Sequence, residues 1–144
     1  MGIAVHATLC LNTKKSNKLN SKSYRDLIAM WEGVDYLFID KVSMISCKFL
    51  CRISEALSMA KGNTAMFGSV NTIFAGNFAH LSPVRETHLY SHINTQYQQA
   101  TTHHQQTVFG KLLWLTVDIV IILHRVERQV GAHNEDFLNL LMCL

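Results

Sequence analysis

The sequence predicts an α/β fold in which helices cover a parallel sheet. Three short apolar runs have the length and the β-branched or aromatic content of strands, namely YLFID (36–40), VNTIFAG (70–76) and LTVDIVIIL (115–123). Segments with helical periodicity separate these runs. Strands that alternate with helices favour a parallel sheet, whose strands are apolar throughout because both faces are buried.

The first predicted helix is YRDLIAMWEG (24–33), which follows a polar and basic segment at residues 13–23. Ser21 and Ser23 are candidate caps for its start, and Gly33 is expected to end it.

A second helix is predicted between Ser43 and Lys61, where apolar residues recur at helical spacing, and Gly62 should close it. A third is expected around Phe109 to Trp114. The polar tract NTQYQQATTHHQQT (94–107), which includes His103 and His104, is typical of a surface loop or insertion. Trp31 and Trp114 lie in apolar helical patterns and are expected in the core.

Composition indicates one domain or part of one. The chain has 144 residues, 49% of them hydrophobic, and has no linker-like segment. The net charge of +3 permits contact with nucleic acid without amounting to a basic tail. Four cysteines without framework spacing fit a reducing compartment, and no apolar run approaches the ~20 residues of a membrane helix. We therefore expect no membrane partner.

Polar residues follow the first two predicted strands. Asp40 and Lys41 come after YLFID, and GNFAHLSPV (76–84) follows the second strand. Ligands of open α/β sheets bind beyond the carboxyl ends of the strands, so these residues are candidates for a site. A strand that ends in aspartate is common, so this feature alone does not identify a nucleotide site.

The combination of segments is more specific. Three segments resemble motifs II, III and IV of the Pif-one-like DNA helicases of superfamily one. They are, in that order, FIDKVSMIS (38–46), IFAGNFAHLSPV (73–84), and ILHRVERQ (122–129) with NEDFLNLL after it. Within this family, the resemblance is greatest to the branch carried by Helitron-type transposons. The segment GIAVHATLCL (2–11) resembles the part of these helicases that lies on the single-stranded DNA track. The resemblance covers nearly the whole chain.

This resemblance implies a partial RecA-like P-loop NTPase domain. Residues 1–144 would form part of the first RecA-like domain, with the link to the second at about 125–144. The family's GxxxxGK(S/T) phosphate loop lies upstream of residue 2, and we expect it to be missing here. For intact relatives the family implies nuclear, ATP- and Mg²⁺-dependent 5′-to-3′ DNA unwinding in DNA repair, recombination and telomere maintenance.

Two residues of motif II carry the catalytic expectations. Asp40 matches the family's Mg²⁺-holding carboxylate, a task that suits a hard oxygen ligand. Lys41 occupies the position of the glutamate that deprotonates the attacking water. An ammonium group with a reference pKa of ~10.4 cannot accept that proton at neutral pH. Loss of a general base costs roughly 10²- to 10⁴-fold in rate.

In motif III, His80 replaces the glutamine that senses the terminal phosphate, and histidine lacks the paired donor and acceptor of an amide. Arg128 matches the motif IV arginine that reaches the γ-phosphate, and its guanidinium fork suits that role. Three further positions depart from the family pattern: Asn77 for Asp, Ser82 for Pro, and Ser69 for a glycine before the motif III strand.

Candidate DNA contacts lie near the N-terminus. His6 and Thr8 fall in the segment that resembles the DNA track, and Lys14 and Lys15 belong to a basic stretch that continues with Lys18, Lys22 and Arg25. The basic stretch is explained equally well as a solvated loop.

Two residue pairs have metal-ligand spacing. Cys47 and Cys51 are four apart on a predicted helix, but no second pair completes a zinc site, so buried thiols are favoured. His88 and His92 share the spacing without a third ligand, and a solvated face is favoured.

The sequence thus predicts part of an ATP-dependent helicase that, as this chain, binds neither ATP nor Mg²⁺ and performs no turnover. Two alternatives stay open. One is a catalytically dead module that binds single-stranded DNA or an intact helicase, and the other is a transposon-derived product without function. The question of whether this chain is an enzyme is left open.

Overall fold

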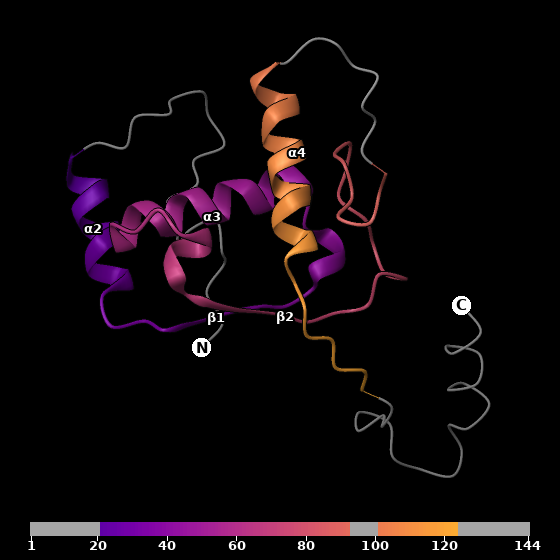
Figure 1. The fold of residues 1–144 in the computed structure, drawn as a ribbon, viewed down its shortest axis with the longest axis horizontal. Helices are drawn as coiled ribbons and strands as arrows, with labels where there is room; N and C mark the ends of the chain where they lie inside the picture. Colours follow the sequence, from indigo (N-terminus) through magenta and orange to yellow (C-terminus); the bar gives the residue numbers. More distant parts are fainter. Residues whose placement is uncertain (1–20, 93–100, 124–144) are drawn as a thin grey trace.

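The computed structural model describes residues 21–92 and 101–123. Figure 1 shows helix α3 lying along one side of the two paired strands, with α2 and α4 at either end of the helix. Helix α3 connects strands β1 and β2 in a β-α-β unit. The elements in order are α2 (Ser21–Trp31), β1 (Tyr36–Ile39), the 3₁₀ turn η1 (Val42–Met44), α3 (Cys47–Lys61), the 3₁₀ turn η2 (Met66–Ser69), β2 (Asn71–Phe74) and α4 (Thr102–Leu115).

Strands β1 and β2 form a parallel pair whose register aligns Tyr36 with Asn71 and Ile39 with Phe74. The Ala75 amide donates to the Ile39 carbonyl at 2.8 Å and so extends the pairing beyond the strand ends. Two of the three predicted strands and their parallel direction are therefore confirmed, and the described residues form an α/β structure.

The third predicted strand, at residues 115–123, is wrong. Helix α4 continues to Leu115, and residues 116–123 adopt no regular structure. Every side chain from Ile119 to Leu123 is at least 71% exposed. A strand needs a neighbour for its backbone N–H and C=O groups, and within the described residues neither β1 nor β2 pairs with this segment. The apolar composition of this segment indicated that its burial is favourable, but composition does not specify a strand with which the segment could pair.

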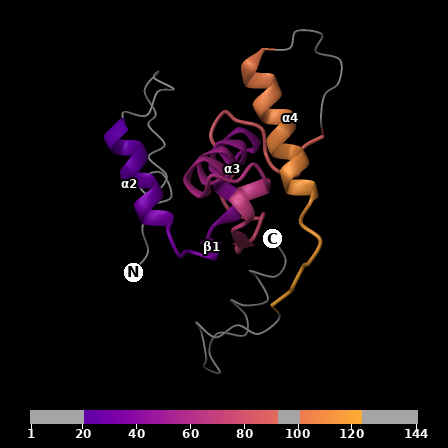
Figure 2. The same ribbon diagram turned by 60° about the vertical axis from the view of Figure 1, so that its left-hand side comes forward.

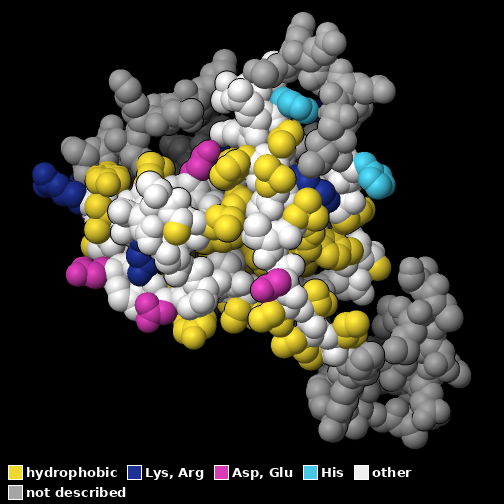
Figure 3. Space-filling view, viewed as in Figure 1, with side chains coloured by type: hydrophobic (Ala, Val, Ile, Leu, Met, Phe, Trp, Pro, Cys, Tyr) yellow, Lys and Arg dark blue, Asp and Glu magenta, His cyan; other side chains and the backbone are white. Residues whose placement is uncertain are grey.

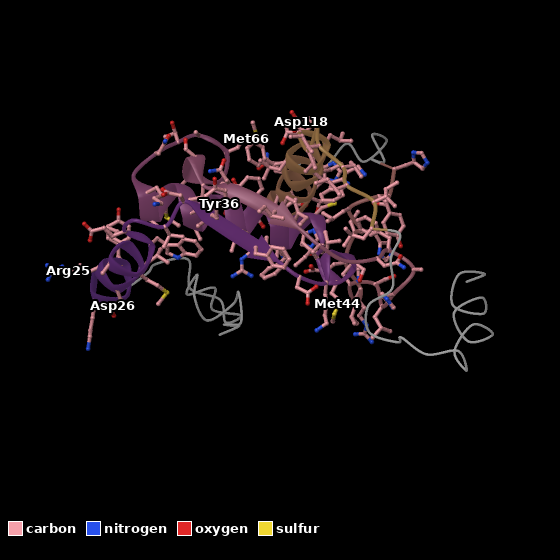
Figure 4. The ribbon with its side chains drawn as sticks, turned by 90° about the horizontal axis from the view of Figure 1, so that it is seen from below. Arg25, Asp26, Tyr36, Met44, Met66 and Asp118 are labelled. Atoms are coloured by element: carbon pink, nitrogen blue, oxygen red, sulfur yellow. The ribbon has the colours of Figure 1, made fainter. Side chains whose placement is uncertain are left out.

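Among the described residues the sheet is covered on one face only, whereas the sequence predicted that both faces are buried. Helix α3 lies on one side of the strands in both ribbon views, and no described helix lies on the other (Figures 1 and 2). Ile39 points to the covered side and is 1% exposed, whereas Tyr36 and Phe38 are 67% and 61% exposed. Figure 4 shows the open face from below, with Tyr36 labelled on β1.

Helix α3 contributes more residues to the core than any other element. The Ser46 hydroxyl caps it by accepting from the Phe49 amide at 3.1 Å, and Gly62 ends it with a left-handed φ of 59°. The helix begins at Cys47 rather than Ser43, because residues 42–44 form a separate 3₁₀ turn. Its apolar face packs with residues from every neighbouring element into one cluster: Leu27, Trp31, Ile39, Leu50, Ile53, Leu57, Phe67, Leu89 and Leu113.

Helix α2 ends as predicted, because Gly33 adopts a left-handed φ of 72° just after it. The prediction that Trp31 lies in the core is confirmed by its 6% exposure. Trp114 is partly buried and packs against the core cluster. None of the helices in residues 21–92 and 101–123 is long and apolar enough to cross a membrane.

Helix α4 starts at Thr102, so the second half of the polar tract is helical rather than a loop. The Thr101 hydroxyl accepts from the His104 amide at 3.3 Å and caps the helix. His103 and His104 therefore belong to its first turn. Only Gly110 and Leu113 of this helix are buried. A helix with so narrow a buried face shows no extended apolar periodicity in its sequence.

Gly110 is the point at which α4 crosses α3, and we predict that Gly110→Ala destabilises the protein. A Cβ atom at this position would lie 1.7 Å from the Cys47 carbonyl oxygen. Helix propensity alone would make this substitution favourable by about 1 kcal/mol. The clash should reverse the sign and lower the free energy of unfolding by about 1–3 kcal/mol.

Urea denaturation followed by circular dichroism measures this change, and Gln105→Ala at an exposed position of the same helix is the matched control. A Gly110→Ala protein as stable as the control would contradict the close crossing.

Candidate functional site

The carboxyl ends of β1 and β2 are joined directly. The Val42 amide, just beyond β1, donates to the Ala75 carbonyl, just beyond β2, at 2.9 Å. The loops that follow both strands therefore start side by side, at the edge where ligands bind in open α/β sheets.

Gly76 allows the two loops to approach this closely. Its φ of 142° is a conformation that other residues rarely adopt, and a Cβ atom there would lie 2.9 Å from the Val42 nitrogen and 3.2 Å from the Lys41 Cα. The glycine of GNFAHLSPV thus brings the second loop against the backbone that carries Lys41.

Asp40 and Lys41 lie exposed at this edge, as predicted from their position after β1. The Lys41 amide donates to the Asp40 Oδ1 at 2.8 Å. Lys41 itself has left-handed backbone angles, φ 59° and ψ 50°, and precedes the η1 turn. The edge therefore presents one carboxylate and one ammonium group on consecutive residues.

His80 lies in the turn that follows β2. The Asn77 Oδ1 accepts from the Ala79 amide at 2.9 Å, and the His80 amide donates to the Asn77 carbonyl at 3.2 Å. His80 is exposed, and its turn starts at the same sheet edge as Asp40 and Lys41. The other predicted site residues lie outside the described residues: His6, Thr8, Lys14, Lys15 and Arg128.

The chemistry of this edge fits a Mg²⁺ ion only in part. Asp40 offers a single hard carboxylate ligand, and Mg²⁺ bound to a nucleotide commonly takes one or two carboxylates together with phosphate oxygens and water. No group of three or more His, Cys, Asp or Glu side chains that could hold a metal ion occurs within residues 21–92 and 101–123. Asp40 could thus hold a phosphate-bound Mg²⁺, whereas Lys41 could not activate water.

Cys47 and Cys51 are buried thiols, as predicted, rather than an accessible pair of zinc ligands. The Cys47 Sγ donates to the His88 carbonyl at 3.2 Å, and the Cys51 Sγ donates to the Glu55 Oε1 at 3.4 Å. Burial raises the pKa of both thiols, that of Cys51 to about 12, and the Glu55 carboxylate adds to the rise at Cys51.

His88 does not lie on a solvated face, which corrects that expectation, whereas His92 is exposed as expected. His88 forms an isolated antiparallel bridge with Ser46, and its ring stacks on Tyr90 with centroids 5.1 Å apart. Its buried Nδ1 has no hydrogen-bond partner. The bridge is a contact between distant residues, which the two-histidine spacing could not indicate.

Residues 86–90 dock beside the start of α3, a feature that sequence reasoning missed. The Cys47 amide donates to the Thr87 carbonyl at 3.0 Å, and the Ser46 hydroxyl donates to the Glu86 carboxylate. Leu89 is 1% exposed and anchors the segment in the core. No local pattern distinguishes this segment from a surface loop.

Comparison with known proteins adds a partial similarity to DNA helicases. The chain is 30% identical over 87 residues to the ATP-dependent DNA helicase PIF1 of Saccharomyces cerevisiae (strain YJM789), which is 58% of this chain and 10% of that protein. It is 30% identical over 63 residues to the ATP-dependent DNA helicase RRM3 of S. cerevisiae (strain ATCC 204508 / S288c), which is 44% of this chain and 9% of that protein.

The chain thus spans about a tenth of the length of these relatives. No protein-family model and no solved structure matches it. The similarity supports a helicase-like relationship.

The Cys51 pKa gives a pH-dependent prediction. Because the folded state holds the thiol proton more tightly than the unfolded chain, this contribution to stability is complete below the thiol's ordinary pKa and is lost as the pH rises toward about 12. The stability of the wild type should therefore fall relative to Cys51→Ala between about pH 8 and about pH 11.

Urea unfolding of both proteins across this range isolates the thiol, because other groups that titrate at high pH are common to the two. A stability difference that does not change with pH would show that the Cys51 thiol is not perturbed by folding.

Proposed function

We propose that this chain is part of the first RecA-like domain of an ATP-dependent 5′-to-3′ DNA helicase, and that it binds single-stranded DNA without hydrolysing ATP. Lys41 beside Asp40 at the carboxyl end of β1 is the observation that carries the proposal. The partial similarity to two yeast DNA helicases supports the helicase relationship. Kinship with Helitron transposons, a nuclear location and roles in DNA repair, recombination or telomere maintenance belong to the same proposal.

The geometry favours a nucleotide site that has lost its chemistry. The edge offers part of what a Mg²⁺–nucleotide complex would need, since Asp40 is exposed and the two strand ends are joined. The adjacent ammonium of Lys41 cannot remove a proton from water, and its positive charge opposes a metal ion at Asp40. The 144 residues also contain no GxxxxGK(S/T) loop to cradle phosphates. Binding of DNA is the family function that needs neither feature.

We predict that the purified chain hydrolyses no ATP, with or without single-stranded DNA. Asp40→Ala should therefore leave the background rate unchanged, and Lys41→Glu should not produce hydrolysis because the 144 residues contain no GxxxxGK(S/T) loop. A coupled phosphate-release assay measures all three proteins. Hydrolysis that copurifies with the chain and disappears in Asp40→Ala would overturn the loss of catalysis.

Single-stranded DNA should bind with strong salt dependence. If Lys and Arg side chains neutralise phosphates, the logarithm of the association constant should fall linearly with the logarithm of salt concentration, by about 0.7 per phosphate neutralised. Fluorescence anisotropy of a labelled oligothymidylate, titrated at several salt concentrations, gives this slope. A chain that is folded by circular dichroism but does not bind at low salt would contradict the proposed function.

A further inference from the structure

Aromatic side chains form a continuous series from the core to the surface beside α4. The Phe74 ring contacts Trp114 edge to face at 5.4 Å, Trp114 contacts Phe78 at 5.7 Å, and Phe78 contacts Tyr90 at 5.4 Å. The last two members are open to solvent, with Phe78 38% and Tyr90 52% exposed. We call Phe78 and Tyr90 the aromatic ledge.

His88 and Lys111 contact the part of the chain that carries Tyr90. The His88 ring stacks on Tyr90 at 5.1 Å with 20° between the planes, so one face of Tyr90 is covered while half of the side chain stays exposed. Leu89 between them is buried, and the Lys111 ammonium donates to its carbonyl oxygen. An exposed aromatic ring is therefore stacked on a histidine, and an ammonium group binds the backbone of the neighbouring residue.

The ledge lies near the candidate nucleotide edge. Phe78 belongs to the turn after β2, and residues 86–90 dock beside Ser46 and Cys47, shortly after β1. Figure 3 shows hydrophobic side chains gathered along α4 on the side where the segment after β2 runs in Figure 1, with a basic side chain among them.

The rings of the aromatic ledge are far more exposed than an aromatic residue of the core. Phe67, which belongs to the same aromatic region, is 8% exposed, as a core position requires. The acidic side chain nearest in sequence, Glu86, is engaged by the Ser46 hydroxyl. Exposed aromatic rings beside a cation match the surfaces on which unpaired bases stack while basic groups contact the phosphates.

We propose that the aromatic ledge stacks an unpaired base of single-stranded DNA, and that Lys111 contacts the adjoining phosphate. This inference rests on the proposed DNA binding and assigns it to residues outside the N-terminal segment from which DNA contacts were predicted. Stacking on a ring does not depend on the identity of the base, so the ledge contributes affinity rather than sequence specificity.

The test compares two tyrosines of similar exposure. Tyr90→Ala should weaken binding of a labelled oligothymidylate on the order of tenfold, because the base loses its aromatic contact. Tyr36→Ala, on the open face of the sheet, is the matched control and should leave affinity unchanged. Tyr90→Phe keeps the ring and should bind like the wild type, and circular dichroism establishes that each variant is folded.

An oligomer of abasic nucleotides separates stacking from charge. The wild type should bind this oligomer more weakly than it binds oligothymidylate. Tyr90→Ala should bind the abasic oligomer as well as the wild type does, whereas Lys111→Gln should weaken binding to both oligomers.

Equal affinities of Tyr90→Ala and Tyr36→Ala for oligothymidylate would overturn the proposal that the aromatic ledge stacks a base, but would not contradict the proposed function. A wild type that binds neither oligomer would overturn the proposed function itself. Preference for oligouridylate or for a duplex would also overturn the assignment to single-stranded DNA.

Discussion

The hydrogen bond between the Val42 amide and the Ala75 carbonyl is the constraint on which the candidate site depends. It joins the loops after β1 and β2, which are separated in sequence by the whole of α3. The parallel register of the strands puts both carboxyl ends at one edge, and Gly76 permits contact closer than any side chain would allow. Asp40, Lys41 and the His80 turn share this edge because of that junction.

The sequence predicted well the features that local patterns encode. The β1 and β2 strands, the parallel direction and the end of α3 at Gly62 follow from apolar runs and from the conformational freedom of glycine. The prediction of a third strand was wrong because an apolar run indicates only that burial of its side chains is favourable. Residues 119–123 have the composition of a strand and remain exposed, since pairing depends on a neighbour that composition cannot specify.

The candidate site likewise contains features that local sequence patterns indicate and features that depend on contacts between distant residues. Asp40 and Lys41 could be placed from the sequence because both directly follow a strand, and the end of a strand is a local feature. The position of residues 86–90 could not, because it depends on contacts of Cys47 with Thr87 and of Ser46 with Glu86, some 40 residues apart. The aromatic ledge depends on this docking, so it was likewise invisible in the sequence.

Ser69 and Lys41 both adopt backbone angles that residues with a side chain disfavour. Ser69 has a left-handed φ of 64°, which costs a residue with a side chain about 1 kcal/mol. Its hydroxyl accepts a hydrogen bond from the side-chain Nδ2 of Asn63 at 2.8 Å, and Gly68 beside it packs against the Leu57 carbonyl, so the surrounding contacts hold the turn.

Lys41 also has a left-handed φ, of 59°, and its backbone amide donates a hydrogen bond to the Asp40 Oδ1. Contacts elsewhere in the fold can thus preserve backbone geometry at a position whose residue disfavours it. They cannot supply a proton acceptor where an ammonium group stands, because that property belongs to the side chain alone. The backbone around the strand ends is therefore compatible with a lysine at position 41, whose side chain cannot activate water.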